Sequence, residues 1–336
     1  MIVKILDDVF YQNNNKLLTK LIYILDDRYY LDINPNILEN STWYNEEVKK
    51  IKTNQDILEG LINKSIFEAP SSKNTITISC KNEKYFSLEE AIIYLDQSFS
   101  IIFENSNNDS LFFDALLKNF PKQIRKILKF KDNLWLEYSM AGGSAEDIIK
   151  TKIKSYNISN FNKEKHKYLR CFVITDSDKL YPDMDLKDDK VKLKEFLDKN
   201  EIKYHFLEKR EMENYLPDEV FEEIKNNENS DYIEAYLRLS SEQKDFFDIQ
   251  KGFPDKNFND LKPDGFRDFF NKISDEDKRI FRKKDLQKIH DKSFKSEFPK
   301  LFSHEKVTKE TLLNRTKHQK NPNELIDILK KIEALL

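Results

Sequence analysis

The middle of the chain alternates between short apolar runs and longer segments with helical spacing. Four runs are typical of buried strands, because their apolar residues stand together instead of alternating with polar ones. They are SFSIIFE (98–104), LWLEYSMA (134–141), YLRCFVITDSD (168–178) and IKYHFLEK (202–209). The segments between them have the spacing of amphipathic helices: LFFDALLKNF (111–120), SAEDIIKTKI (144–153) and VKLKEFLDKN (191–200). This alternation predicts an α/β fold, a mostly parallel sheet flanked by helices, over residues 96–220.

The two flanking regions have different patterns. Residues 1–95 mix helical spacing, in KLLTKLIYIL (16–25) and NQDILEGLI (54–62), with a strand pattern in TITISC (75–80). After Pro217 strand signals fade, and helices are expected over EEIKNNE (222–228), YIEAYLRL (232–239) and FRDFFNKI (266–273). We therefore expect an N-terminal α/β region at 1–95, a central domain at 96–220 and a mainly helical region at 221–336.

Composition excludes several classes of function. The number of Lys and Arg residues (57) nearly balances that of Asp and Glu (60). The chain therefore has no overall positive charge that would indicate binding to nucleic acid. Cys80 and Cys171 are the only cysteines, which excludes a zinc or disulfide framework. None of the five glycines fits a P-loop. No apolar stretch approaches the length of a membrane span and no signal-peptide pattern is present, so we expect a soluble, cytoplasmic protein that binds no membrane.

The charge is uneven along the chain. Residues 278–320 hold 14 Lys and Arg against 5 Asp and Glu, with four phenylalanines among them: Phe281, Phe294, Phe298 and Phe302. One interpretation is a helical bundle with a solvated basic face. The other is a surface that binds phosphates while its apolar residues face inward.

Acids follow three of the four expected strands. Glu104 ends the first, Asp176 and Asp178 end the third, and Glu211 and Glu213 come shortly after the fourth. The carboxyl ends of parallel strands meet at one edge, where neighbouring strands lie about 5 Å apart. Clustered carboxylates repel unless a cation neutralises them, and oxygen ligands without His or Cys suit Mg²⁺ or Mn²⁺. This pattern favours phosphodiester chemistry at a metal site.

The second expected strand ends instead on Gly142, Gly143 and Ser144. Glycine lets a backbone approach a ligand closely, and Ser144 suits a helix N-cap with Asp147 three positions on. A phosphate can bind at such a helix N-terminus. A tight strand-to-helix turn explains the same residues without a ligand.

These residues together resemble a Toprim domain, the metal-binding module of topoisomerases, DnaG-type primases and OLD-family nucleases. The matching features are the Glu after the first strand, the glycine turn after the second and the Asp-x-Asp after the third, over about residues 96–220. REMENYLP (210–217) is similar to the segment after the fourth strand of OLD-like nucleases. The resemblance implies that Glu104, Asp176, Asp178 and Glu213, and less directly Glu211, bind metal. It also implies that Lys209 stabilises charge on the phosphate.

Two departures narrow the resemblance. Asn105 stands where glycine is usual, and Asp109 lies one residue further along than the family's next acid. No glycine follows Asp178 as it does in primases and topoisomerases. These departures point to the nuclease branch and leave the role of Asp109 open.

The resemblance implies a Mg²⁺- or Mn²⁺-dependent endonuclease that cleaves DNA or RNA, an effector of antiphage defence. OLD-type nucleases carry or accompany an ATPase, which implies a partner of the ABC or AAA type in trans or a stand-alone nuclease, and leaves a homo-oligomer open. The alternative is a degenerate Toprim module that regulates or binds a partner and cuts nothing.

Overall fold

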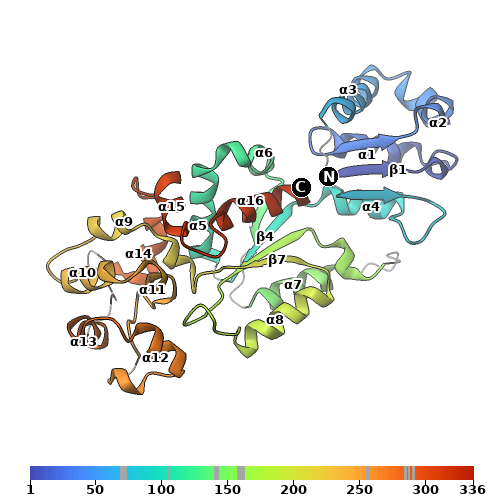
Figure 1. The fold of residues 1–336 in the computed structure, drawn as a ribbon. Coiled ribbons are helices and arrows are strands. Elements are labelled where there is room, and N and C mark those ends of the chain that lie inside the picture. The colour runs from blue at the N-terminus through green and yellow to red at the C-terminus, as the bar shows by residue number, and fades with distance from the viewer. Residues whose placement is uncertain are drawn as a thin grey trace.

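The computed structural model describes residues 1–68, 74–104, 106–139, 144–156, 163–254, 257–283, 286, 288–289 and 292–336. The chain forms an N-terminal sheet with its helices, a larger central sheet and a helical C-terminal region (Figure 1). Within the described residues, no helix combines the length and the apolar character needed to cross a bilayer.

The N-terminal region folds around a small parallel sheet of order β2-β1-β3. Its strands are β1 (Ile2–Ile5), β2 (Tyr30–Ile33) and β3 (Thr75–Ile78). Its helices are α1 (Asn15–Leu25), α2 (Pro35–Asn40), α3 (Lys52–Glu68) and α4 (Leu88–Asp96). The helices expected over 16–25 and 54–62 and the strand expected over 75–80 are confirmed, with ends that differ by a few residues.

The central sheet is fully parallel, with the order β5-β4-β6-β7. Its strands are β4 (Phe99–Phe103), β5 (Leu136–Ser139), β6 (Cys171–Thr175) and β7 (Lys203–Phe206). The connecting helices are α5 (Ser106–Asn119), α6 (Arg125–Asp132), α7 (Ala145–Ser155) and α8 (Asp188–Lys199). The predicted α/β fold with a parallel sheet flanked by helices is therefore confirmed at this coarse level.

The two inner strands of the central sheet, β4 and β6, are buried along their whole length because helices cover both faces of the sheet. Successive strand residues point to opposite sides. Ile101 and Phe103 of β4 join the core that α5 and α6 contribute to, whereas Ile102 joins a second core with Ile149 of α7 and Leu197 of α8. Figure 1 shows α7 and α8 on one face and α5 and α6 on the other. This burial explains why the strand sequences are apolar throughout.

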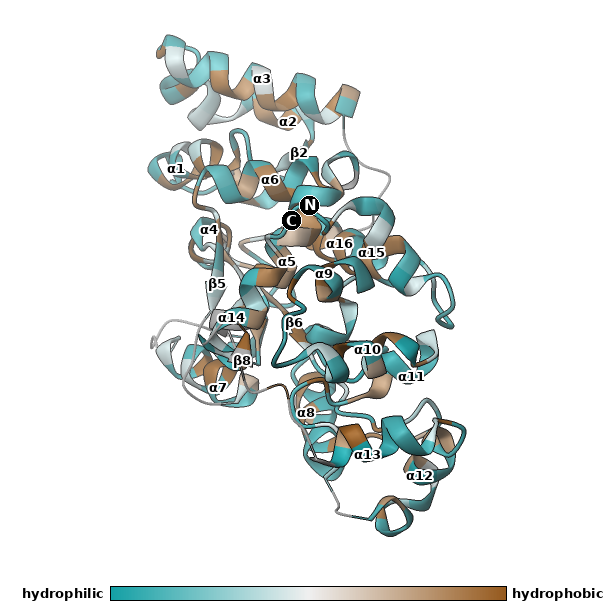
Figure 2. Cartoon of the chain, turned by 90° about the vertical axis from the view of Figure 1, so that its left-hand side faces the viewer, coloured by the Kyte–Doolittle hydropathy of each residue, from teal (hydrophilic) through white to brown (hydrophobic). Residues whose placement is uncertain are grey.

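The C-terminal region is mainly helical, as the sequence predicts. Its helices are α9 (Asp218–Glu223), α10 (Ser230–Arg238), α11 (Ser241–Phe246), α12 (Asp264–Phe270), α13 (Asp275–Lys283), α14 (Phe294–Leu301), α15 (Lys309–Thr316) and α16 (Glu324–Leu335). A short antiparallel pair, β8 (Lys288–Ile289) and β9 (Lys292–Ser293), was not predicted. Surface helices such as α3 and α10 carry both hydrophilic and hydrophobic residues (Figure 2).

The prediction of one C-terminal helix is largely wrong. The prediction placed a helix over 222–228, but α9 ends at Glu223. The side chain of Asn226 accepts from the amides of Glu228 and Asn229, and Asn229 accepts from the amide of Asn226. Asparagine side chains that bond nearby amides compete with the helical pattern, so this polar stretch forms a turn.

The C-terminal region packs back onto the rest of the chain. The four phenylalanines of the basic segment are buried, so the prediction that they face inward is confirmed. Helix α14 packs on α5, and α16 packs on α6. Asn74 donates to the carbonyl of Ala334 at 3.0 Å, which places the C-terminus beside the N-terminal region (Figure 1).

Candidate active site

Glu104 and the end of β6 lie side by side at the carboxyl edge of the central sheet. Strands β4 and β6 are parallel neighbours, with Phe103 paired to Ile174. The next residues are therefore Glu104 and Thr175, and the Thr175 hydroxyl donates to Glu104 Oε2 at 2.8 Å. The sequence predicts that acids following the parallel strands meet at one edge, and this register places Glu104 beside the Asp-x-Asp segment.

Asp178 reaches the same edge through a turn. Its φ of 53° lies in the left-handed region, so the chain does not continue extended after β6. Aspartate tolerates this conformation better than most residues, because its short polar side chain can bond locally. The Asp178 amide donates to the carbonyl of Arg210 at 3.0 Å, which ties the turn to the segment after β7.

A lysine that the sequence did not single out joins these acids. Lys190 comes from the first turn of α8, and its side chain is only 3% exposed. Its Nζ lies 2.5 Å from Glu104 Oε2 and 2.9 Å from Asp178 Oδ2. Burial alone would lower the pKa of Lys190, but the charges of Glu104 and Asp178 outweigh it and raise the pKa. Lys190 therefore stays charged between the two acids.

Asp176 lies within the electrostatic influence of four other acids. Its Oδ1 accepts the amide of Met212 at 3.1 Å. Burial and then the nearby carboxylates raise the pKa of Asp176 well above its ordinary range. In decreasing order of effect these carboxylates are Asp109, Glu213, Glu211 and Glu104. The structure therefore brings together acids from β4, α5, β6 and the segment after β7, including Asp109, whose role the sequence left open.

Glu211 and Glu213 differ in their partners. Both belong to the turn before and within the 3₁₀ helix Met212–Tyr215. The guanidinium of Arg210 bonds Glu211 at 3.2 Å and Asp248 at 2.9 Å. Burial, then Glu211, raises the pKa of Glu213 to about 8. Of the two, Glu211 has a protein cation beside it, and Glu213 is crowded by other acids.

Lys209 lies apart from this edge. It is fully buried, and its Nζ donates to Asp245 Oδ1 at 2.6 Å and to the carbonyls of Arg315 and Asn214 at 2.7 and 3.1 Å. Burial, then the charge of Arg315, lowers the pKa of Lys209 to about 7 although Asp245 opposes this. All three ammonium hydrogens have acceptors inside the protein, so Lys209 has no donor left for the phosphate role expected of it.

The glycine turn is described only from Ser144 onward. Gly142 and Gly143 lie outside the described residues. Ser144 is the N-cap of α7, as predicted, and its hydroxyl accepts the amide of Asp147 at 3.2 Å. That hydroxyl also donates to Asp147 Oδ2 at 2.9 Å, in place of the reciprocal bond of a capping box. Ser144 therefore caps a helix, and its phosphate role stays a prediction.

A cavity of about 550 Å³ lies next to the Asp-x-Asp loop. Ser177 and Lys179 line it from the loop, Glu208 from beyond β7, and His318 and Lys320 from the C-terminal region. Ser177 itself is buried, and its hydroxyl donates to the carbonyl of Lys209 at 2.7 Å. The cavity thus lies beside the loop that carries Asp176 and Asp178, and neither of these two acids lines it.

The donor chemistry of the edge fits a hard divalent cation. Every candidate ligand is a carboxylate, and such oxygens suit Mg²⁺ or Mn²⁺ rather than zinc. Among the described residues, however, no group of three or more His, Cys, Asp or Glu side chains is already spaced to hold an ion. The acids face one edge without closing around one point, as repulsion between like charges favours.

Comparisons with known proteins identify no relative of the chain. No family model, no curated protein and no solved structure matches the chain.

Proposed function

We propose that the chain is a Mg²⁺- or Mn²⁺-dependent endonuclease that hydrolyses phosphodiester bonds of DNA or RNA. The observation that carries the proposal is the convergence of carboxylates on Asp176 at the carboxyl edge of the parallel sheet. In open α/β sheets this edge is where ligands bind. Crowded acids raise one another's pKa, and a divalent cation relieves that repulsion.

The side chains at the edge are proposed to have different roles at a bound ion. Asp176 and Glu213 offer carboxylate oxygens to the ion, and the Met212 amide fixes one oxygen of Asp176. Arg210 holds Glu211 in place beside them. Glu104 and Asp178 lie at the same edge and pair with the ammonium of Lys190. A bound Mg²⁺ or Mn²⁺ supplies Lewis-acid polarisation of a phosphoryl oxygen and a bound water of lowered pKa.

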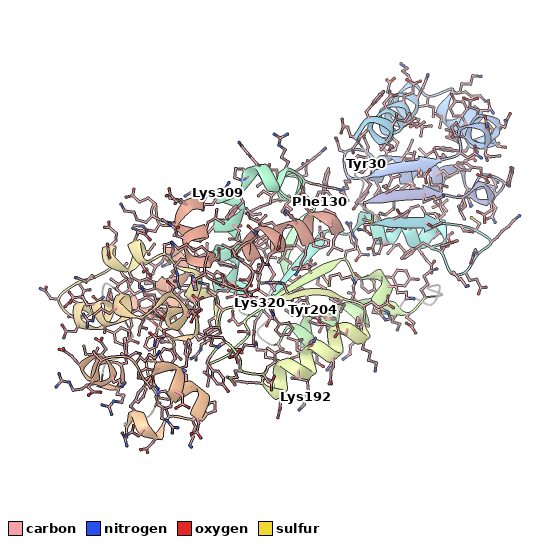
Figure 3. All side chains as sticks on the ribbon, in the orientation of Figure 1. Tyr30, Phe130, Lys192, Tyr204, Lys309 and Lys320 are labelled. Carbon is pink, nitrogen blue, oxygen red and sulfur yellow. The ribbon has the colours of Figure 1, made fainter. Side chains whose placement is uncertain are left out.

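The basic segment 278–320 is proposed to hold the nucleic-acid backbone. Its buried phenylalanines anchor the segment, while Lys292, Lys295 and Lys309 are exposed. Lys309 lies on the side of the molecule away from Lys192 of α8 (Figure 3). Exposed lysines on a segment with an apolar underside can contact phosphates while the segment stays anchored to the core. The role in antiphage defence and the ATPase partner rest on the Toprim resemblance alone.

One observation favours a second function, a regulatory or binding module that cuts nothing. Lys190 already pairs with both Glu104 and Asp178, and no three acids among the described residues are spaced for an ion. A protein cation at the edge reduces the repulsion between acids that a metal would otherwise relieve. Affinity for Mn²⁺ that depends on Asp176 separates the two functions, because a degenerate site lacks it.

The test is cleavage of plasmid DNA, single-stranded DNA and total tRNA, each with Mn²⁺, Mg²⁺ or EDTA. The wild-type chain is compared with Asp176→Ala/Asp178→Ala. The matched control is Asp183→Ala/Asp185→Ala, which removes two exposed acids from the adjacent loop. The proposal predicts metal-dependent cleavage by the wild type and the control and none by the active-site variant. Cleavage that survives in the active-site variant contradicts it.

A further inference from the structure

Two protein cations lie among the acids of the edge, and each forms ion pairs with a different pair of acids. Arg210 bonds Glu211 and Asp248. Lys190 bonds Glu104 and Asp178. Within the described residues, neither Asp176 nor Glu213 forms an ion pair with a Lys, Arg or His side chain. The edge therefore has one side whose acids pair with a protein cation and another side, at Asp176 and Glu213, whose acids do not.

The ammonium of Lys190 is held in one place. Besides the two carboxylates, Nζ lies 3.3 Å from the Thr175 hydroxyl, so its three hydrogens have three acceptors. Thr175 also donates to Glu104, which closes the arrangement. A lysine fixed in this way between the ends of β4 and β6 has no donor left for substrate. Lys190 can therefore influence the site only by positioning the two acids and by its charge.

Phosphodiester-cleaving sites often hold two metal ions about 3.5–4 Å apart, clamped by shared carboxylates. A second ion between Glu104 and Asp178 would have to displace a buried ammonium. That displacement is costly, because the lysine would keep its charge and lose its partners. An ion that binds the carboxylates of Asp176 and Glu213 would displace no protein cation.

We propose that Lys190 takes the place of one of the two cations, so that the chain binds a single divalent ion, on the side of Asp176 and Glu213. This inference rests on the proposed metal-dependent function and refines it. Glu104 is then a partner of Lys190, and Lys190 is a positioning residue that balances the charge of the Asp-x-Asp turn.

The test is the number of Mn²⁺ ions bound per chain, measured by calorimetry on the full-length protein without substrate. The wild type binds one ion. Lys190→Met frees Glu104 and Asp178 and raises the number to two. Lys187→Met, which changes an exposed lysine just before α8, leaves the number at one. A structural role of Lys190 alone would lower stability without adding an ion.

Three further variants keep the test decisive if Lys190→Met fails to fold. Glu104→Gln/Lys190→Met removes one acid together with the cation and binds one ion. Glu104→Gln alone also keeps the single ion, whereas Asp176→Asn loses it. Loss of the ion in Glu104→Gln overturns the inference, and so does a count that stays at one in folded Lys190→Met.

The outcomes separate the inference from the proposed function. A wild-type chain that binds two ions overturns the single-ion site and leaves the nuclease proposal standing. A wild type that binds one ion and cleaves no nucleic acid leaves the single-ion site standing and contradicts the nuclease proposal. A wild type that binds no Mn²⁺ overturns both.

Discussion

Lys190 Nζ lies 2.5 Å from Glu104 Oε2, although 86 residues separate the two in the chain. The contact joins the first turn of α8 to the end of β4 and places a positive charge within the acidic edge. It divides that edge into a side whose acids pair with a protein cation and a side, at Asp176 and Glu213, whose acids do not. The charged residues on and around the two sides should therefore respond differently to substitution.

Lys209 is expected to stabilise the fold instead of acting in catalysis. Lys209→Met leaves Asp245 buried with one cation fewer, and breaking a buried pair from one side costs about 3–5 kcal/mol. We expect a loss of that order in the free energy of unfolding, measured with urea. Any cleavage activity of the folded fraction at low temperature should stay close to that of the wild type.

The control for Lys209→Met is Lys203→Met, which changes an exposed lysine on β7 and should alter stability little. If Lys209→Met instead leaves stability unchanged and abolishes cleavage, the catalytic role expected from the sequence is restored and the structural role is wrong.

Glu90 should make the fold sensitive to acid. Burial opposes ionisation of this carboxylate, but hydrogen bonds from Tyr168, Ser87 and Lys163 outweigh burial and lower its pKa from 4.5 to about 2. A depressed carboxyl pKa stabilises the fold above pH 4.5, and this contribution disappears as the pH falls towards 2. The full contribution is at most roughly 3 kcal/mol.

Glu90→Gln should therefore reduce the free energy of unfolding at pH 7 and flatten its decline between pH 4.5 and 2. Urea unfolding at several pH values measures both effects. Glu89→Gln, an exposed neighbour in the same helical turn, serves as the control and should keep the decline. An equally steep decline in Glu90→Gln would show that other groups cause the acid sensitivity.

The basic segment should contribute to binding of nucleic acid through its exposed lysines. Lys292→Glu/Lys295→Glu should weaken binding to DNA or RNA in EDTA. It should also reduce the dependence of log affinity on log salt by roughly 1 for each phosphate that the segment no longer neutralises. Fluorescence anisotropy at several salt concentrations measures both. Lys16→Glu/Lys20→Glu makes the same charge change on α1. Equal effects of the two pairs would support a solvated face without a specific phosphate surface.

Ser144 should act as a helix cap whether or not phosphate binds nearby. Ser144→Ala removes the acceptor of the Asp147 amide and should lower the free energy of unfolding by about 1 kcal/mol. Ser144→Asp keeps a capping oxygen and should retain most of that stability. A larger loss of cleavage in Ser144→Asp than in Ser144→Ala would indicate repulsion of a phosphate at this position.

The sequence predicts the sheet well because its two inner strands are short and buried on both faces. Apolar runs such as FSIIF and CFVIT leave little choice of structure, and acids directly after them must reach the carboxyl edge. The adjacency of Glu104 and the segment that begins at Asp176 needed the strand order, which the sequence left open. The helix expected over 222–228 failed because side chains of asparagine, not apolar spacing, decide the local structure there.

The two lysines show what sequence reasoning could not reach. Lys190 lies in a helix full of other lysines, and nothing in the pattern KVKLK separates a buried lysine from an exposed one. Lys209 stands next to the acids in sequence but turns into a network with Asp245 of α11. Contacts with residues from distant elements determine which of the two lysines lies beside the acids of the edge. The one signal in the sequence was that Lys190 lies on the first turn after the Asp-x-Asp loop.

The most direct test of the account is the affinity of the chain for Mn²⁺ with and without the Asp176 carboxylate. Calorimetry should show binding by the wild type and by Asp183→Asn, which changes an exposed acid of the adjacent loop. Asp176→Asn should weaken binding by more than about tenfold, because it removes a carboxylate oxygen from the side of the edge that lacks a protein cation. Identical Mn²⁺ binding by Asp176→Asn and the wild type would contradict a metal site at this edge.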